Sequence, residues 1–236
     1  VADVPRQVSA PAMNTSAVFA NLASTHAPLV ARGEPELSTR MIEAAVRLQP
    51  YERHYRRQLV FDLLARAEAG IGQLAQNPKL LDAVVQNLGD AEVTARAAAL
   101  RFPDDPWVNV ALANVRQMQG LSALRPLDPD GGLLAAREAN RLFAFVHRMF
   151  PAEPLVLRNW AELLFDQGNV PDAYALLDRM EQLVPYDPAP LRIAIKIDDK
   201  SMISQTVARA QRALDPRAFS QIWAVANPQQ IQGDKK

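Results

Sequence analysis

The chain has 236 residues, with 26 basic and 26 acidic side chains and a formal net charge of zero. This balance argues against a general surface for nucleic acid or anionic membranes, and the absence of cysteine excludes disulfides, cysteine-ligated zinc and thiol nucleophiles. Apolar residues make up 49% of the chain and aromatic residues 6%. Such a composition favours closely packed helices over a β-sandwich.

At the N-terminus, residues 1–16 lack the apolar core of a signal peptide and predict a flexible segment. A helical domain is expected over residues 17–226, followed by a flexible tail over 227–236. No apolar run approaches the roughly 18 residues that a membrane helix needs. The first helical hairpin is predicted between Phe19 and Pro50, and Pro28 should kink or divide its first helix.

A recurring spacing before proline predicts a repeated unit. Five, eight and twelve residues before Pro185 stand Met180, Leu177 and Ala173, which share one helix face. The same counts from four other prolines return mostly apolar or small residues, with Ala or Ser twelve residues before the proline in each case. These prolines are Pro50, Pro103, Pro151 and Pro216. Helical hairpins are therefore expected to close near Pro50, Pro103, Pro151 and Pro185.

The segment from Pro151 to Pro188 contains one complete unit, with predicted signals for the ends of its two helices. Gly168 is predicted to end the first helix in a left-handed conformation, and Asn169 to cap the second. The phrases PDDP, PAEP and PYDP each end one helix and begin the next, because proline suits a first helical turn and the preceding acid can cap it.

Two insertions interrupt the spacing. Residues 67–84 predict a long helix with extra turns, and residues 121–132 predict a loop from their Pro, Asp and Gly content. Within that loop, DPDGG indicates a turn, since it lacks the alternating oxygen ligands and closing Glu of a calcium site. Trp223 is expected to pack a final helix onto the last hairpin.

The pattern resembles the tetratricopeptide repeat. Trp160, Ala161 and Leu164 stand at its helix A positions, while Ala173, Leu177 and Pro185 stand at its helix B positions. The resemblance implies an all-α fold of stacked antiparallel hairpins forming an irregular right-handed superhelix. It also implies that helix A of each hairpin lines a concave groove.

That groove would hold a protein or peptide partner, as an extended segment or an acidic terminus. The candidate groove residues are Arg57, Trp107, Asn114, Arg158, Glu162 and Asp166. On the third helix A, Val110 and Gln117 are expected on the same exposed face. The alternative is that this face is simply solvated.

Residues for catalysis are not evident in the sequence. His26, His54 and His147 have no metal-ligand spacing, and the Gly-rich phosphate motifs and the nucleophile-elbow motif do not occur. We therefore expect no catalytic residue, metal or cofactor. A helical hydrolase would need a Glu in an apolar cleft, for which Glu162 is the one candidate, on a polar face.

Two longer phrases, IEAAVRLQPYERHYRRQLVFDLLARA and FVHRMFPAEPLVLRNWAELLFDQGNVPDAYALLDRMEQLVPYDP, resemble the soluble C-terminal repeat region of the O-antigen ligase/polymerase family. The resemblance implies a non-catalytic interaction domain of a glycan-handling membrane enzyme in the bacterial envelope, with apolar spans upstream of Val1. The membrane part of the same chain would then be one partner. The alternative is a free-standing adaptor, or a co-chaperone-like protein, of the envelope or the cytoplasm.

Overall fold

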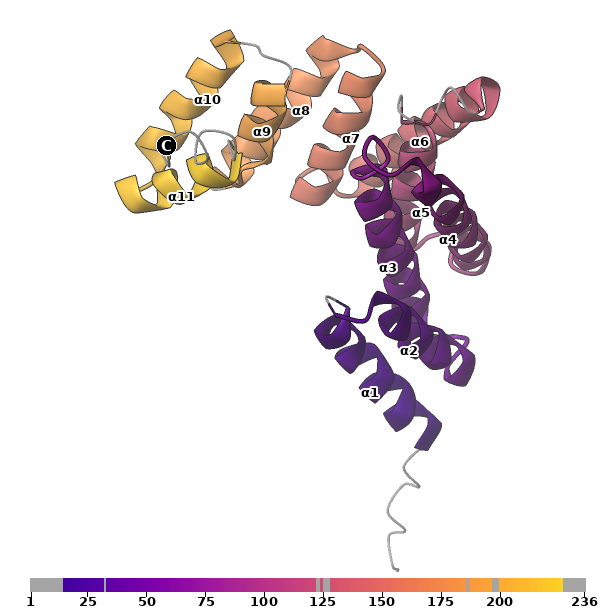
Figure 1. Ribbon diagram of the computed structural model, residues 1–236. Coiled ribbons are helices and arrows are strands. Elements are labelled where there is room, and N and C mark those ends of the chain that lie inside the picture. The colour runs from indigo at the N-terminus through magenta and orange to yellow at the C-terminus, as the bar shows by residue number, and fades with distance from the viewer. Residues whose placement is uncertain are drawn as a thin grey trace, which may run out of the picture. The chain divides into compact units, whose positions relative to one another are not determined.

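The computed structural model describes residues 15–31, 33–121, 124, 128–185, 187–196 and 200–226. The described residues form eleven α-helices, one short 3-10 helix and no β-strand (Figure 1). The helices are α1 (Thr15–Val30), α2 (Pro35–Leu48), α3 (Arg53–Ile71), α4 (Leu81–Arg101), α5 (Pro106–Gln119), α6 (Pro129–Met149), α7 (Pro154–Asp166), α8 (Val170–Leu183), α9 (Ala189–Lys196), α10 (Lys200–Ala213) and α11 (Pro216–Ala226). The predicted terminal segments fall largely outside the described residues, and α1 begins at Thr15.

Consecutive helices pack as antiparallel pairs, which confirms the all-α hairpin fold. The pairs include α1 with α2, α3 with α4, α7 with α8, and α9 with α10. The final helix, α11, packs against α9 and α10 as expected for the helix that carries Trp223. The chain divides into two compact units, residues 1–111 and 112–236, with the boundary inside α5. The right-handed superhelix stays a prediction.

The proline spacing locates four helix ends correctly. Helices α2, α4, α6 and α8 end at Leu48, Arg101, Met149 and Leu183, each two residues before its proline. The counted positions form the buried faces of these helices, and all twelve are at most 2% exposed. They are Ser38, Ile42, Ala45, Ala91, Ala95, Ala98, Ala139, Phe143, Val146, Ala173, Leu177 and Met180.

The spacing before Pro216 does not identify a buried helix face. It predicts Ser204, Ala208 and Gln211 as buried, but all three are exposed on α10, which instead buries Thr206 and Ala210. Pro216 opens α11 rather than following a helix end. Pro216 therefore corresponds to the second proline of PDDP, PAEP and PYDP, which begins a helix. The spacing applies only to the first proline of these phrases, so counting back from Pro216 gives positions on the wrong face of α10.

An acidic cap before that second proline recurs along the chain. The carboxylate oxygen of Asp105 accepts hydrogen bonds from the backbone N–H groups of the next helix, and Glu153, Asp187 and Asp215 do the same for α7, α9 and α11. Each acid satisfies N–H groups that a helix start leaves unpaired, and its charge is favourable at the positive end of the helix dipole. The predicted role of the acid is confirmed.

Gly168 ends α7 as predicted, with a φ angle of +78°. Its N–H donates to the carbonyl oxygen of Phe165, and the N–H of Asn169 donates to that of Leu164 at 2.8 Å. This pair of bonds is the Schellman arrangement, which requires a left-handed residue at the position of Gly168. Asn169 takes the N-cap position of α8, but its side-chain amide donates to Asp172 at 2.7 Å.

The two insertions fold differently from their prediction. The first is not one long helix: α3 ends at Ile71, and α4 begins at Leu81 after a turn and the 3-10 helix Pro78–Leu80. Pro78 disfavours a helical conformation at the residue before it, so the added length goes into two long helices. In the second insertion, α6 starts at Pro129 because Asp128 caps it, accepting from the N–H of Gly131 at 2.9 Å. Residues 122–123 and 125–127 lie outside the described part.

Pro28 does not divide α1, which continues to Val30. Proline has no N–H, so the carbonyl oxygen of Ser24 four residues earlier loses its helical partner. The Nε2 of Gln58 on α3 donates to that oxygen at 2.8 Å. The proline lies in the last helical turn, so the helix forgoes one bond and gains a contact with α3.

Candidate functional site

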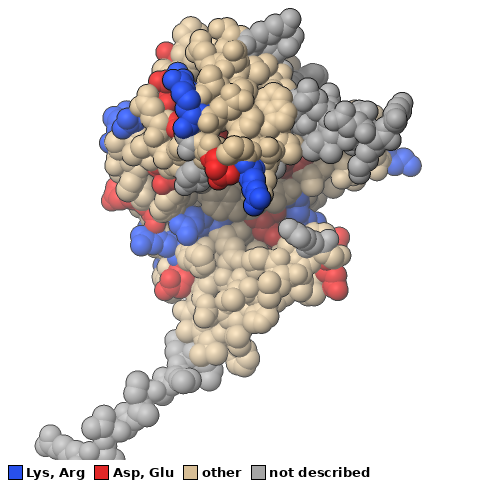
Figure 2. All heavy atoms as spheres, turned by 90° about the vertical axis from the view of Figure 1, so that its left-hand side faces the viewer, with Lys and Arg blue, Asp and Glu red and all other residues tan. Residues whose placement is uncertain are grey.

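In the upper and middle parts of the face that Figure 2 draws, Lys and Arg side chains are intermixed with Asp and Glu side chains. This agrees with a net charge of zero. A binding site must therefore be sought in local groups of side chains rather than in one field of a single sign.

In unit 1, the first turns of α3 carry an unusual concentration of positive charge. Arg53, Arg56 and Arg57 all lie within the first five residues of the helix, and its first turn contains no acidic residue. Cations are unfavourable at the positive end of a helix dipole, by roughly 0.3–1 kcal/mol each when exposed. A sequence that accepts this cost at a partly exposed place is a candidate for function.

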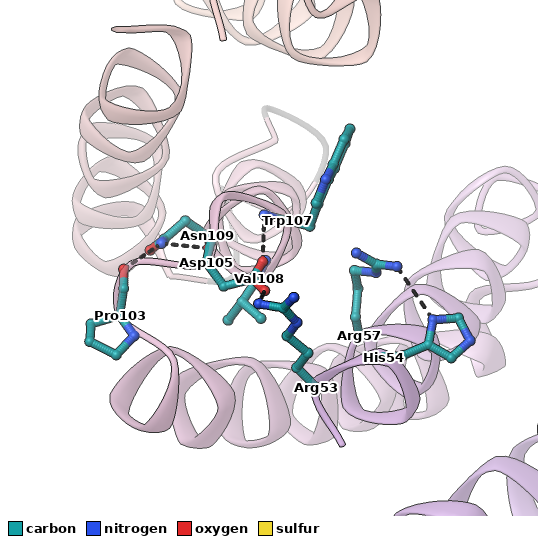
Figure 3. Close-up of polar contacts among 8 residues, drawn as sticks. All are labelled: Arg53, His54, Arg57, Pro103, Asp105, Trp107, Val108 and Asn109. Atoms are coloured by element: carbon teal, nitrogen blue, oxygen red, sulfur yellow. Dashed lines mark hydrogen bonds and ion pairs between the residues drawn. The ribbon is translucent and has the colours of Figure 1, made fainter. Parts of the chain in front are cut away.

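Asp105 holds the first of these arginines (Figure 3). Arg53 Nη1 lies 2.8 Å from Asp105 Oδ2, and the carboxylate is 6% exposed while the Arg53 side chain is 65% exposed. The other carboxylate oxygen, Oδ1, accepts from the N–H of Trp107 at 2.9 Å and of Val108 at 3.1 Å. The buried carboxylate thus has a partner at each oxygen, as a buried charge requires.

Asn109 fixes the same corner from within α5. Its Nδ2 donates to the carbonyl oxygens of Pro103 and Asp105, both at 2.9 Å. The corner between α4 and α5 is therefore held by the side chains of Asp105 and Asn109, which bond backbone groups on the two sides of Pro106. This rigid corner sets the place at which the half-buried Trp107 leaves the helix.

Arg57 differs from Arg53 in its partners. Its Nη2 lies 3.4 Å from His54 Nδ1, a long contact between groups that are not of opposite charge. Within the described residues, no carboxylate pairs with Arg57. Figure 3 shows Arg53 and Arg57 extending from α3 toward the start of α5, where Trp107 lies. This face of unit 1 offers guanidinium groups beside an aromatic ring, which we call the Arg57–Trp107 face (Arg53, Arg57 and Trp107).

In unit 2, a chain of amides joins α5 to α7. Asn159 Nδ2 donates to Asn114 Oδ1 at 2.9 Å, and Arg158 Nε donates to Asn159 Oδ1 at 3.2 Å. Two of the predicted groove residues are thus connected through Asn159, which is not among the predicted residues. Glu162 is exposed and Asp166 is half-buried on the same helix.

All six predicted groove residues keep exposed surface. Arg57 and Trp107 belong to unit 1 and the other four to unit 2, so their placement on one concave side stays a prediction. Val110 and Gln117 were predicted wrongly: they are 0% and 9% exposed. Residues 108–113 of α5 are all buried, because this helix packs on several sides, whereas the prediction assumed one apolar stripe.

The chemistry of the remaining surface does not indicate catalysis. Glu162 is exposed and so does not occupy the apolar cleft that a helical hydrolase would need. No three His, Cys, Asp or Glu side chains gather as a metal site within the described residues. A hollow of about 180 Å³ lies between α8 and α10. In it Arg209 pairs with both Asp178 and Glu181, so its charges are largely matched internally.

None of the described helices is both long enough and apolar enough to span a membrane. The fold is similar to the crystal structure of a thermophilic TPR protein from Thermus thermophilus, with a TM-score of 0.61 and 15% sequence identity. The match covers 88% of this chain and 98% of that one. No family model matches the chain, and no curated protein matches its sequence. The likeness shows a TPR-like helical repeat fold.

Proposed function

We propose that this chain is a non-catalytic interaction scaffold whose Arg57–Trp107 face binds an extended peptide with an acidic group. The observation that carries the proposal is Arg57, a guanidinium on a partly exposed face that lacks a carboxylate partner within the described residues. Guanidinium groups bind carboxylates through paired N–H donors, and an aromatic ring beside them adds apolar contact.

Arg53 has a different role in this proposal. Asp105 matches its charge, but most of its side chain remains exposed, so the pair can still donate N–H groups outward. The rigid PDDP corner lets Trp107 present its ring without ordering a loop on binding, which lowers the entropic cost of association. An acidic residue near Arg57 with an apolar neighbour on Trp107 is the ligand that fits.

The test is an array of acidic peptides and their neutral amide counterparts, followed by calorimetry with the strongest acidic binder. We expect Arg57→Glu and Trp107→Ala each to weaken binding by about tenfold or more, since each removes an anchor of the interface. Arg40→Glu is the matched control, because it makes the same charge change at an exposed position of α2. Equal binding of acidic and neutral peptides, or equal loss in the control, would contradict the proposal.

The predicted groove residues of unit 2 are tested separately, with Arg158→Glu against the same peptide array. We expect this substitution to weaken binding of an acidic peptide, while the thermal midpoint changes by no more than a few degrees. Unchanged affinity would show that Arg158 does not contribute to binding.

We propose further that the chain is the region that follows the membrane helices of a bacterial O-antigen ligase or polysaccharide polymerase, placed outside the cytoplasm at the membrane. The two long phrases of the sequence support this idea. The encoding gene should then contain several apolar segments of about 20 residues upstream of Val1. A signal peptide alone would favour a free-standing envelope adaptor, and an initiating Met alone a cytoplasmic scaffold.

A further inference from the structure

Unit 2 contains a hollow of about 180 Å³ between α8 and α10. Helix α9 packs against both of these helices (Figure 1). The polar side chains that line the hollow include Asp178, Glu181, Ser201, Gln205, Thr206 and Arg209. Its volume is well below the roughly 300–1,000 Å³ of pockets that hold drug-sized ligands. The hollow therefore suits one small polar group, such as the end of a single side chain.

The pairing of charges in this hollow leaves negative charge in excess. Arg209 Nη1 bonds Glu181 Oε2 at 2.6 Å and also bonds Asp178 Oδ1, so two carboxylates share one guanidinium nitrogen. A smaller neighbouring hollow is lined by the same Glu181 and Arg209 and adds Asp187. Among the described side chains that line the two hollows, the acidic ones thus outnumber the single basic one. This local excess favours a cationic ligand.

Two polar atoms at the hollow lack a partner. Thr206 is 6% exposed and lines both hollows, yet its hydroxyl has no hydrogen-bond partner within the described residues. By comparison, Thr25 and Thr39 each donate to the carbonyl oxygen four residues earlier in their helices. The Glu181 side chain is 10% exposed, and its Oε1 has no partner in the part of the chain that the structure describes. Polar atoms with so little exposure normally have a hydrogen-bond partner, so both atoms are candidates for contact with a ligand.

A primary ammonium group matches these acceptors better than other ligand groups do. It carries one positive charge and three N–H donors, and Glu181 and Thr206 supply unused acceptor oxygens for them. An anion would meet an excess of negative charge, and a neutral ligand would leave that excess unmatched. A divalent cation needs more oxygen ligands, and no three His, Cys, Asp or Glu side chains gather for one within the described residues.

We propose that this hollow, the α8–α10 site (Asp178, Glu181, Thr206 and Arg209), binds the ammonium group of a lysine side chain from a partner protein. The side chains of Asp178 and Arg209 are 45% and 43% exposed, so the hollow is open to solvent beside them. The aliphatic stem of lysine enters there while its backbone stays outside. The ammonium group then lies beside the guanidinium of Arg209, against Glu181 Oε1 and Thr206 Oγ1. This site is independent of the function proposed above for unit 1, and it takes a group of the opposite charge.

Nuclear magnetic resonance titration tests the proposal, with the blocked peptide Ala-Lys-Ala as the probe. One partly exposed ion pair contributes little, so we expect a dissociation constant on the order of 1 mM. The backbone amide signals of Gln205 and Thr206 should shift in a saturable way. The same peptide acetylated at the lysine Nζ should cause no such shift, because it keeps the length of the side chain but loses the charge.

Butylamine separates a peptide lysine from a free amine, since it presents the same ammonium group without a backbone. It should bind more weakly than the lysine peptide. Butylamine that binds as tightly as the peptide would overturn the assignment to a partner's side chain. The absence of saturable shifts with the lysine peptide, or equal shifts with the acetylated peptide, would overturn the site itself.

Two substitutions remove the acceptor groups. Glu181→Gln and Thr206→Val should each weaken binding of the lysine peptide by about threefold or more. Because the Thr206 hydroxyl has no protein partner, Thr206→Val should leave the urea midpoint unchanged or raise it, which separates binding from stability. Glu43→Gln is the matched control, because it makes the same change at a partly exposed acid of α2. Unchanged binding in Thr206→Val, or an equal loss in Glu43→Gln, would contradict the proposal.

Arg209→Gln should have an effect of the opposite sign. It removes the guanidinium that competes for both carboxylates, so the lysine peptide should bind about threefold or more tightly. Circular dichroism before the titration establishes that the variant keeps its helical content. Arg212→Gln, at an exposed position of the same helix, should leave binding unchanged. Weaker binding in folded Arg209→Gln would show that the carboxylates do not receive the ligand, and would overturn the proposal.

Discussion

Arg53 on α3 and Asp105 before α5 form an ion pair of 2.8 Å across two successive hairpins. The same carboxylate caps α5 through the N–H groups of Trp107 and Val108. One buried acid thus stabilises a helix start and fixes the corner at which two helices of unit 1 meet. The consequence is that the candidate binding residue Trp107 depends on a structural residue two positions before it.

Removing the two partners should have unequal effects on stability. Asp105→Ala loses the cap and leaves Arg53 unpaired, so we expect it to lower the free energy of unfolding by about 1–2 kcal/mol. Arg53→Gln should cost less, about 1 kcal/mol: the exposed arginine itself contributes little and Oδ1 keeps both backbone donors, but Oδ2 of the buried carboxylate loses its charged partner. Urea denaturation of both variants measures the difference.

Asp128→Ala provides the control for this comparison. Asp128 caps α6 from an exposed position through the N–H of Gly131, so the substitution removes a cap alone, at a cost of about 1 kcal/mol. Asp105→Ala should cost more than Asp128→Ala. The reverse order would show that the pairing with Arg53 and the burial of Asp105 contribute little.

Much of this fold follows from local sequence signals. Three signals that each act over a few residues are confirmed. Gly168 predicts the end of α7, the acid–proline phrases predict helix starts, and the spacing of Ala173, Leu177 and Met180 predicts a buried helix face. The errors arise where a local signal is ambiguous. Proline both ends and begins helices in this chain, so Pro216 was placed in the wrong register.

The candidate site was less predictable than the fold. Arg57 and Trp107 stand at helix A positions and are predicted from them. The pairing of Asp105 with Arg53 and the bonds that join Asn159 to Asn114 and Arg158 are not predicted. The bond from Asn159 to Asn114 spans 45 residues of sequence. Such contacts depend on how successive repeats stack. Because the spacing between repeats is irregular, the residues that face one another across two repeats cannot be predicted from a single sequence. Val110 was misplaced for the same reason, since burial of α5 on several sides is a tertiary effect.

The same substitution at two glycines should change stability in opposite directions. Gly168→Ala forces a Cβ into a left-handed conformation, although open space surrounds the site, and should destabilise by about 1 kcal/mol or more. Gly89→Ala lies in the middle of α4 with no atom near the added Cβ, and should stabilise by about 0.5–1 kcal/mol.

Thermal and urea unfolding of Gly168→Ala and Gly89→Ala measure whether each substitution raises or lowers the free energy of unfolding. Gly168→Asn should fall between the wild type and Gly168→Ala, because asparagine tolerates the left-handed region better than alanine. A neutral Gly168→Ala would mean that the end of α7 rearranges without cost.

Ala173 tests how closely α7 and α8 pack. It is fully buried in a cluster with Ala161 and Leu164 of α7 and Leu177 of α8. Ala173→Leu should overpack this contact and lower the free energy of unfolding by about 1–3 kcal/mol. Ala175→Leu, at an exposed position two residues along the same helix, should have an effect within about 0.5 kcal/mol. Similar unfolding midpoints for the two variants would show that the helices do not meet closely at Ala173.

The surroundings of His147 make the free energy of unfolding depend on pH. Burial, and then the nearby charge of Arg179, lower the pKa of His147 below its ordinary value of 6.5. The ring lies 5.5 Å from that of Trp160, and its Nδ1 is shielded from solvent without a hydrogen-bond partner. The unfolded chain therefore takes up this proton at a higher pH than the folded chain does. The stability that the neutral ring contributes is fully present above 6.5 and is lost as the pH falls through the lowered pKa.

The measurement is urea denaturation of the wild type and of His147→Gln at several pH values on both sides of 6.5. Glutamine has no proton to gain in this range, so the difference in unfolding free energy between the two proteins should shift in favour of the variant as the pH falls. The shift should be small, since the half-buried ring is partly screened by solvent. A difference that is constant with pH, or that moves toward the wild type on acidification, would show that His147 binds its proton at least as readily in the folded chain.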